Sequence, residues 1–440
     1  MFLTWLKKSK NLVLGNIKLG QFLFFSKTNL SCVIVNALEW YDFVIYGFFA
    51  ESIGKLFFPA SNPIAHLMMS LGVFSIGLLA RPIGAFLFGR IGDKLSRKRA
   101  LISSLYLMAF PTFFIGFLPT YEQIGIVASF LLIIMRFTQG IAMGGGFTSS
   151  MIFLIEHAED SKRGRVGSLA SFSLILGVFA GSVITTFFSY VLSFEQLEKW
   201  GWRIPFILSI LGSFLGIFMQ KNLEEPLLFK ESKTNLKYNS FSENSLLFLS
   251  KKIALVVLLD FLNAIGFFLL VIFLPIFYKV YLKFPFNTSQ LIHLVNLGVF
   301  ALATIAGGSL SDLYGRKILI KTSSAFLIFF SYFLFRELQE GDFLLAFLME
   351  CILATSLGLF FGTLPATLAE IFPTKIRLTG VSVGHNLSMA LFGGSAPLLA
   401  TYCIEQTDNL ACPGILLSLS ALLTFSSLPF LTEKAGEPLE

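Results

Sequence analysis

Five charged side chains lie inside long apolar stretches of this chain and could take part in chemistry. They are Glu39, Asp42, Arg136, Asp260 and Glu350. A charge at the centre of a helix in hydrocarbon costs about 2.5–3.5 kcal/mol on insertion scales, so charges kept there usually bind a solute or carry protons. We therefore expect these five residues to line a pathway for a polar substrate and protons. No set of residues indicates a catalytic centre or a metal site, and no cofactor is expected.

The first two acids form a pair on one helical face. Glu39 and Asp42 are three positions apart, so both project to the same side. Two carboxylates that close in a low dielectric cannot both stay ionised, so one is expected to take up a proton near neutral pH. Arg136 is expected either as their counter-ion or as the binder of a substrate carboxylate, and both roles stay open. Tyr41 and Tyr46 could line the cavity through cation–π contacts, although packing explains them as well.

The elements that must hold these charges are membrane helices. The 440 residues are 55% hydrophobic and 13% charged, whereas a soluble domain carries roughly 25% charged residues. Apolar runs of about 20 residues predict an all-α membrane protein with twelve spans. The spans are expected at 30–54, 64–88, 100–118, 123–146, 166–191, 203–220, 252–277, 289–307, 318–335, 343–366, 379–403 and 413–432.

The five charges fall on the first, fourth, seventh and tenth spans. This spacing is expected if the first helix of every three-helix repeat lines one central cavity. Arg81, in the second span, is the exception. Because it lies toward one end of its span, we expect it to pack or to extend its charge to the membrane surface.

Two loop motifs occur twice, which indicates a duplicated chain. The stretch Gly89-Arg-Ile-Gly-Asp93-Lys-Leu-Ser96-Arg97-Lys98 recurs 219 residues later as Gly308-Ser-Leu-Ser-Asp312-Leu-Tyr-Gly315-Arg316-Lys317. A second pattern spans seven positions from Glu156 to Arg163 and again from Glu370 to Arg377. Internal repeats in a membrane protein indicate two helical bundles around a central site. The predicted division is 1–28 N-terminal cytoplasmic segment, 29–220 first six-helix bundle, 221–250 cytoplasmic linker, 251–432 second six-helix bundle and 433–440 cytoplasmic tail.

We expect the repeated loops to act as gates at the cytoplasmic helix ends. Asp93 and Asp312 could be held by a helix N-terminus or by a neighbouring arginine. The basic residues that follow could bond the ends of adjoining helices, although membrane anchoring alone would also explain them. The predicted gate residues are Gly89, Asp93, Arg97, Lys98, Gly308, Asp312, Gly315, Arg316, Lys317, Glu156, Arg163, Glu370 and Arg377.

The positive charges indicate the orientation. Of the 33 lysines and arginines, 25 fall on one side of the predicted spans and 6 on the other. The positive-inside rule then places both termini in the cytoplasm. The net charge of +7 therefore reflects topology, and nucleic acid is not expected as a partner.

The cysteines and one histidine receive structural interpretations. Cys32, Cys351, Cys403 and Cys412 lack the spacing of metal ligands. Cys403 and Cys412 flank the last outer loop and could pair in an oxidising space, but apolar packing is the expectation for all four. A satisfied hydrogen bond is expected for His385.

Taken together, the motifs resemble those of the major facilitator superfamily, whose signature is the duplicated Gly-x3-Asp-x2-Gly-Arg-Lys loop. More narrowly, the chain is similar to its metabolite:proton symporter branch, which includes proline/betaine and α-ketoglutarate permeases. The stretches that carry this likeness are Asn36-Ala-Leu-Glu39-Trp-Tyr-Asp42-Phe-Val-Ile-Tyr46-Gly, Arg81-Pro through Asp93, Arg136-Phe-Thr-Gln139-Gly140, Gly201-Trp202-Arg203-Ile-Pro205-Phe, Glu370-Ile-Phe-Pro373-Thr-Lys-Ile-Arg377 and Gly384-His-Asn386 through Pro397.

The resemblance implies twelve helices, alternating access and proton-driven uptake in the plasma membrane, the inner membrane of a bacterium. It also implies a cavity lined by the first, fourth, seventh and tenth helices. This chain departs from the branch at three positions: Ser96 replaces a glycine, Gly146 replaces a glutamate that follows two glycines, and His385 replaces a tyrosine. The loss of the glutamate bears on proton coupling.

The leading hypothesis is a secondary active transporter for a small polar metabolite, either a zwitterion such as proline or betaine or a carboxylate. Its partners would be substrate, protons and lipid, and it is expected to work as a monomer. The alternative is a membrane sensor or receptor on a transporter fold that transports poorly. An enzyme is not expected.

Overall fold

The protein is described by a computed structural model that covers residues 27–59, 63–220, 223–234, 244–340 and 342–439. Within these residues the secondary structure is helical, with no strand. Most of the expected N-terminal segment, residues 1–26, lies outside the described residues.

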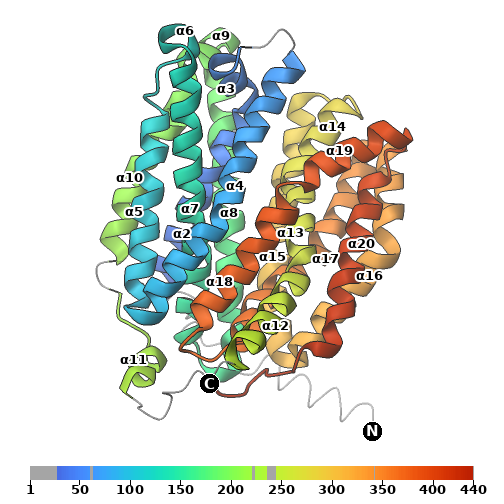
Figure 1. Cartoon of the computed structure of the whole chain (residues 1–440). Helices are drawn as coiled ribbons and strands as arrows, with labels where there is room; N and C mark the ends of the chain where they lie inside the picture. The colour runs from blue at the N-terminus through green and yellow to red at the C-terminus, as the bar shows by residue number, and fades with distance from the viewer. Residues whose placement is uncertain (1–26, 60–62, 221–222, 235–243, 341, 440) are drawn as a thin grey trace.

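The helices of the first half stand together on the left of Figure 1. In chain order they are α2 (Lys27–Phe48), α3 (Ala50–Phe57), α4 (Pro63–Lys94), α5 (Arg97–Ile115), α6 (Tyr121–Ile124), α7 (Ile126–Glu156), η3 (Asp160–Lys162), α8 (Arg163–Val191), α9 (Phe194–Gln196), η4 (Leu197–Gly201) and α10 (Arg203–Gln220). The short helix α11 (Leu227–Thr234) follows in the connecting stretch.

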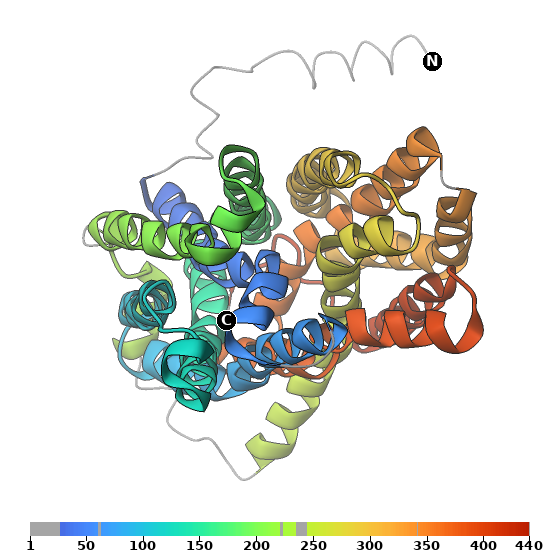
Figure 2. The same ribbon diagram turned by 90° about the horizontal axis from the view of Figure 1, so that it is seen from above.

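The helices of the second half stand on the right of the same view. They are α12 (Asn244–Leu259), α13 (Phe261–Phe268), η6 (Leu269–Phe273), α14 (Leu274–Val280), α15 (Phe286–Tyr314), α16 (Arg316–Glu337), η7 (Leu338–Glu340), α17 (Phe343–Glu370), α18 (Arg377–Ser388), η8 (Met389–Gly393), α19 (Ala396–Thr407), α20 (Cys412–Ser427) and η9 (Leu428–Phe430). Seen from above, the two groups meet along one seam (Figure 2), where α4 packs on α18 and α8 packs on α15.

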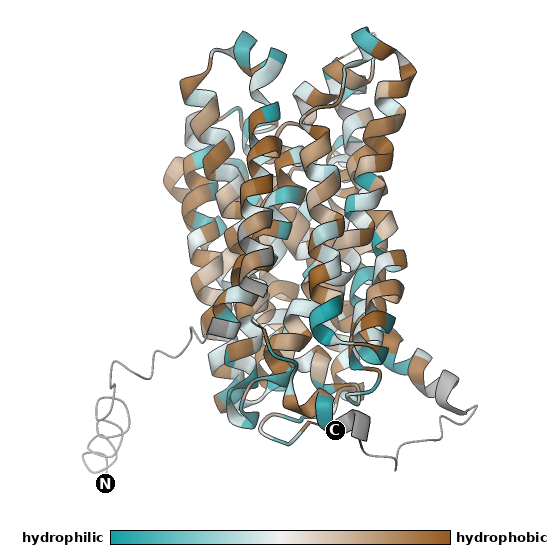
Figure 3. Cartoon of the chain, turned by 90° about the vertical axis from the view of Figure 1, so that its left-hand side faces the viewer, coloured by the Kyte–Doolittle hydropathy of each residue, from teal (hydrophilic) through white to brown (hydrophobic). Residues whose placement is uncertain are grey.

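Nine helical stretches of the described chain are long and apolar enough to cross a membrane. The predicted spans fall on these helices and on α2 with α3, on α5 and on α10. Apolar residues run along the middle of the helices and polar residues gather at the end near the C-terminus (Figure 3). Two spans are less regular than expected, because a π-helical turn interrupts each of them at η6 and η8. Such turns are frequent at functional sites.

The prediction that all four cysteines pack as apolar side chains is wrong for two of them. Cys403 and Cys412 form a disulfide with their Cα atoms 5.9 Å apart. The chain turns sharply between α19 and α20 through Asp408, which has a left-handed backbone with φ of 50°. This turn places the two cysteines side by side, so the structure shows the pairing that the sequence analysis gave as the alternative.

Glycines permit the closest helix crossings inside each half. A Cβ atom on Gly140 of α7 would lie 1.9 Å from the carbonyl oxygen of Gly77 on α4. In the second half, a Cβ on Gly307 of α15 would lie 2.2 Å from the carbonyl oxygen of Leu359 on α17. The second and fourth long helices of both halves therefore cross backbone to backbone, as small residues allow in membranes.

This crossing predicts that Gly307→Ala lowers stability while Gly298→Ala does not. Both glycines lie on α15, but a Cβ at Gly298 would meet nothing within 4 Å. Overpacking costs about 1–3 kcal/mol, so thermal denaturation in detergent should show a lower melting temperature for Gly307→Ala alone. Equal melting temperatures for the two variants would contradict the close crossing.

Candidate functional site

An aspartate from the first half binds the start of a helix in the second half. Asp93, near the end of α4, accepts hydrogen bonds from the backbone N–H groups of Leu378 at 3.1 Å and Thr379 at 2.8 Å, in the first turn of α18. The same carboxylate pairs with Arg97. Gly89 allows this approach, because a Cβ there would lie 2.8 Å from the Cα of Thr379. We call the end of the molecule that carries these loops, the lower end of Figure 1, the motif end.

The second copy of the motif makes the reciprocal contact. Asp312 of α15 accepts hydrogen bonds from the N–H groups of Gly164 and Arg165, both at 2.8 Å, in the first turn of α8. Arg316 pairs with Asp312 at 2.7 Å. A Cβ on Gly308 would lie 2.4 Å from the carbonyl oxygen of Gly164. Each aspartate thus supplies the acceptor that the free N–H groups of a helix start require, and it does so across the seam.

Buried ion pairs surround the first of these contacts. Glu156, at the end of α7, accepts from Arg97 Nη2 at 3.0 Å and from Arg377 Nη1 at 2.9 Å. Arg97 also donates to the carbonyl oxygen of Thr374 at 2.7 Å. Since Glu156 and Arg97 belong to the first half and the other two residues to the second, this network also joins the halves.

The second contact has an equivalent network. Glu370, at the end of α17, pairs with Arg316 Nη2 at 3.1 Å and with Arg163 Nη1 at 3.4 Å. Arg163 is the first residue of α8, so this pair again crosses the seam. Four sets of contacts, arranged as two related pairs, therefore close the motif end.

Two glutamates of this region are not among the gate residues predicted from the sequence. Glu225 accepts from the hydroxyl of Ser96 and, at 3.1 Å, from the backbone N–H of Lys98. Glu433 accepts from the backbone N–H of Lys317 at 2.9 Å. They cap the first turns of α5 and α16. The motif lysines, Lys98 and Lys317, therefore contribute to these contacts through their main-chain N–H groups. Their only sequence signal is that one follows the sixth predicted span and the other the twelfth.

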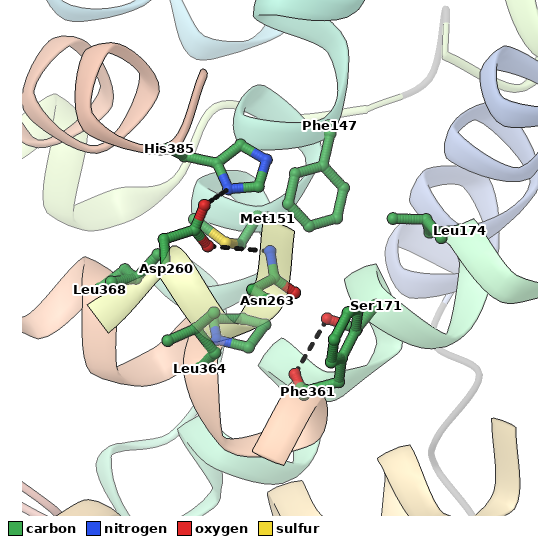
Figure 4. Close-up of a pocket in the computed structure, with 11 residues that line it drawn as sticks. Phe147, Met151, Ser171, Leu174, Asp260, Asn263, Phe361, Leu364, Leu368 and His385 are labelled. Atoms are coloured by element: carbon green, nitrogen blue, oxygen red, sulfur yellow. Dashed lines mark hydrogen bonds and ion pairs between the residues drawn. The ribbon is translucent and has the colours of Figure 1, made fainter. Parts of the chain in front are cut away.

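Between the halves lies a small pocket, shown in Figure 4, whose lining is mostly apolar but includes a carboxylate, an imidazole and an amide. His385 Nδ1 of α18 is 3.1 Å from Asp260 Oδ2, at the junction of α12 and α13, and Asn263 donates to the other oxygen of Asp260 at 2.8 Å. The cavity measures about 10 Å³, which is room for roughly one water molecule. The residues that line it are Phe147, Met151, Ser171, Leu174, Asp260, Asn263, Phe361, Leu364, Pro365, Leu368 and His385.

Arg81 is not at the membrane surface, so of the two expected alternatives the structure shows packing. Its side chain is completely buried, and its Nε donates to Asn386 Oδ1 of α18 at 2.8 Å. Its charge acts on both Asp260 and Glu39. Both Nη atoms are buried without a hydrogen-bond partner in the described residues. The side chain cannot reach the surface because α18 covers this face of α4.

Only one member of the predicted pathway, Asp260, lines the central pocket. Glu39 points into the first half, where Ser104 donates to its carboxylate at 3.1 Å. A Cβ on Gly146 would lie 1.8 Å from Glu39 Oε2, so the glycine is required by the carboxylate beside it. Asp42 faces the hydroxyl of Thr112 and is also buried in the first half. The paired acids therefore share one face, but that face is turned away from the pocket.

Arg136 does not serve as their counter-ion in this structure. It donates to Gln139 Oε1 at 2.7 Å, and its guanidinium lies 4.2 Å from the ring centroid of Tyr46 and 4.6 Å from that of Phe43. Within the described residues it has no ion pair with a carboxylate. Tyr41 donates to the carbonyl oxygen of Pro205 at 3.0 Å. Neither tyrosine lines the pocket of Figure 4.

A larger cavity opens between the halves at the end opposite the motifs. It measures about 260 Å³, and we call it the vestibule. Lys279 is the charged residue that lines it, with His293 as a titratable neighbour. Its full lining is Gly47, Phe48, Ala50, Phe74, Val271, Ile272, Pro275, Ile276, Lys279, Val280, Ser289, Gln290 and His293. The molecule is thus closed at the motif end and hollow at the other.

No group of three or more histidine, cysteine, aspartate or glutamate side chains within the described residues is placed to hold a metal ion. The central pocket and its surroundings bring together polar groups that can take part in ionic contacts. They comprise a carboxylate, an imidazole, an amide and a nearby buried guanidinium.

Comparison with known proteins agrees with this architecture. Residues 28–431 match the Major Facilitator Superfamily, and the chain belongs to that superfamily. It is 30% identical to the glycine betaine/proline/ectoine/pipecolic acid transporter OusA of Dickeya dadantii (strain 3937), over 99% of this chain and 88% of the relative. It is 30% identical to the proline/betaine transporter of Escherichia coli (strain K12), over 99% of this chain and 89% of the relative.

Solved structures show the same fold. The proton:xylose symporter XylE bound to 6-bromo-6-deoxy-D-glucose superimposes with a TM-score of 0.79 at 16% identity, over 94% of this chain and 97% of the other. The inward-open xylose transporter XylE from E. coli gives a TM-score of 0.67 at 17% identity, over 92% of this chain and 96% of the other.

Because Glu156 pairs with arginines of both halves, we expect Glu156→Gln to open the motif end. Removing one partner of a buried ion pair costs about 3–5 kcal/mol, because Arg97 and Arg377 would be left without their shared carboxylate. In a protein carrying Ser168→Cys at the buried seam, peptide-level mass spectrometry should show faster alkylation of that cysteine when Glu156→Gln is added.

The matched control is Glu159→Gln, three residues along the chain. Glu159 also pairs with a basic residue, Lys162, at 2.7 Å, but both side chains are exposed. An exposed pair contributes about 0–1 kcal/mol, so alkylation should stay at the starting rate. Identical rates for the two variants would show that Glu156 does not hold the seam closed.

Proposed function

We propose that this chain is a proton-coupled secondary active transporter that takes up a small zwitterion with a carboxylate group, such as proline or a betaine. The observation that carries the proposal is the central pocket. Its Asp260–His385 pair from the second half lies across the seam from Arg81 of the first half. This pocket sits between a closed motif end and an open vestibule, and the named substrates of the relatives belong to the same chemical class.

The charges of the site suit a zwitterion. The two free Nη groups of Arg81 would hold the substrate carboxylate, since a guanidinium offers a planar pair of donors. The cationic end would face Asp260, between the rings of Phe147 and Phe361 that line the pocket. Aromatic faces attract quaternary ammonium groups. Trp40 lies beside Arg81, with its ring centroid 5.7 Å from the guanidinium carbon. Its ring would separate the charged substrate from the buried carboxylates of Glu39 and Asp42.

Transport would follow from movement of the two halves against each other. The central pocket of about 10 Å³ is too small for such a substrate, whereas the vestibule measures about 260 Å³. Substrate would enter through the vestibule as the pocket widens, and the halves would then close above it. Release requires the predicted gate residues at the motif end to separate, as in alternating access by helical repeats.

The proposed topology has twelve transmembrane helices, with the motif end and both termini in the cytoplasm. Support comes from the distribution of lysine and arginine along the sequence, 25 on the side of the predicted spans that carries the loop motifs and 6 on the other. The protein would then be a multi-pass protein of the bacterial plasma membrane. It is proposed to act as a monomer, because the pocket and both gate networks are complete within one chain.

Uptake by purified protein in liposomes tests the function. With an inwardly directed proton gradient, radiolabelled glycine betaine or proline should accumulate, and oxoglutarate and citrate should not. Collapsing the gradient with a protonophore should abolish accumulation. Binding without accumulation of any of the four solutes would favour the alternative of a sensor built on a transporter fold.

The carboxylate subsite predicts that Arg81→Gln raises the half-saturation concentration for the zwitterion by about 10- to 100-fold. Losing a hydrogen bond to a charged group costs about 1.5–3 kcal/mol, and each 1.4 kcal/mol is tenfold. The matched control is Arg90→Gln on the same helix, where the exposed guanidinium stacks on Phe86 with 4.9 Å to the ring centroid. Initial uptake rates measured over a range of substrate concentrations give the half-saturation concentration of each variant. An unchanged half-saturation in Arg81→Gln would place the carboxylate elsewhere.

A further inference from the structure

A second buried cluster of titratable groups lies apart from the central pocket. Tyr278 of α14 donates its hydroxyl to Glu350 Oε2 of α17 at 2.7 Å. His293 Nδ1 of α15 lies 3.6 Å from the other oxygen, Glu350 Oε1. All three side chains are nearly inaccessible to solvent. None of them lines the pocket of Figure 4.

This cluster adjoins the vestibule. His293 forms part of the vestibule wall, together with Ser289 and Gln290 on the same helix. Lys279, the neighbour of Tyr278 in the chain, also lines that cavity. The two carboxylate–histidine pairs therefore have different surroundings: His385 and Asp260 line the enclosed pocket, whereas His293 and Glu350 meet the open cavity.

The hydrogen bonding of the cluster is incomplete in a specific way. Glu350 Oε1 and both ring nitrogens of His293 are buried without a hydrogen-bond partner in the described residues. A separation of 3.6 Å is too long for a hydrogen bond. One added proton on the imidazole would turn this contact into a charge-assisted pair, which is shorter and stronger than a neutral one.

In the part of the chain that the structure describes, no fixed positive charge is paired with Glu350. The titratable groups that face it are Tyr278, His293 and Cys351, and within the described residues no lysine or arginine forms an ion pair with it. Cys351 donates to Asn296 Oδ1 at 2.8 Å. Asn296 lies one turn along α15 from His293. By contrast, Asp260 and Glu39 have the charge of Arg81 nearby. A mobile proton is therefore the cation that this cluster is built to accept.

We propose that Glu350, His293 and Tyr278 form the proton-loading site of the carrier, separate from the substrate pocket at Asp260. This inference rests on the proposed function. A proton from the outer solution crosses the vestibule and binds to the His293–Glu350 pair, which changes the net charge of the cluster from −1 to 0. Tyr278 stays neutral and keeps donating to the second carboxylate oxygen. The same proton leaves toward the cytoplasm after the vestibule closes and the motif end opens.

The test separates proton coupling from substrate movement in proteoliposomes that contain the full chain. Accumulation of labelled glycine betaine or proline is measured under an inward proton gradient, and counterflow of the same solute is measured at equal pH on both sides. Glu350→Gln should lose at least about ten-fold in accumulation and keep counterflow within about two-fold, because exchange needs no net proton transfer. Its counterflow should also become independent of pH, since an amide cannot titrate.

The matched control is Glu405→Gln. Glu405 also accepts a hydrogen bond from a tyrosine, Tyr281, at 3.3 Å, but it is exposed at the tip of α19. This variant should accumulate substrate like the unmodified protein. His293→Gln supplies a second variant that keeps a polar group of similar size, and it should lose accumulation and the pH dependence of counterflow as Glu350→Gln does.

Each other outcome overturns the proposal. Normal accumulation in Glu350→Gln or in His293→Gln would show that the cluster does not load the driving proton. Loss of counterflow together with accumulation, in a variant that remains monodisperse, would assign Glu350 to substrate binding or to packing. Accumulation driven by a sodium gradient in place of the proton gradient would replace the proton by another cation. If the unmodified protein accumulates nothing, the proposed function itself has failed.

Discussion

The arrangement of the two halves depends on a carboxylate from each half binding the first turn of a helix in the other. A helix start has N–H groups without partners, and hydrocarbon offers none. Asp93 satisfies α18, and Asp312 satisfies α8, across the seam. In the proposed transport cycle, water at the membrane surface would replace either carboxylate when the seam opens. The glycines of the motifs follow from this contact, because any side chain at Gly89 or Gly308 would keep the helices apart.

The halves are alike in their gates and different in what they enclose. The first half buries Glu39 and Asp42 in its own interior and contributes a guanidinium, Arg81, to the seam. The second half holds two carboxylate–histidine pairs, at Asp260 and at Glu350. In the proposed mechanism, the duplicated scaffold would supply the motion of the halves, and the unequal burial of charge would divide substrate binding from proton loading. Such a division would require matching contacts at the motif end but not matching charges in the two interiors.

Position 146 shows how one residue can rearrange such a site. The absence of a side chain there leaves the space that the carboxylate of Glu39 fills, 1.8 Å from where a Cβ would be. The carboxylate of Glu39 therefore lies beside α7, although it is carried by α2. In the proposed mechanism, proton coupling does not need a carboxylate at position 146. The proton would be loaded at Glu350, which lies on α17 in the other half.

The sequence by itself determined the internal repeat, the resemblance to the superfamily and the position along the chain of every buried charge, and it predicted which stretches are apolar enough to span a membrane. Tertiary structure decided which way those charges face. It turned Glu39 and Asp42 away from the pocket, placed Arg81 at the seam and joined Cys403 to Cys412. The physical reason is that a membrane helix is apolar on all sides, since lipid and protein core are equally apolar. Hydropathy then reveals the depth of a residue but not the rotation of its helix, which only packing against neighbouring helices determines.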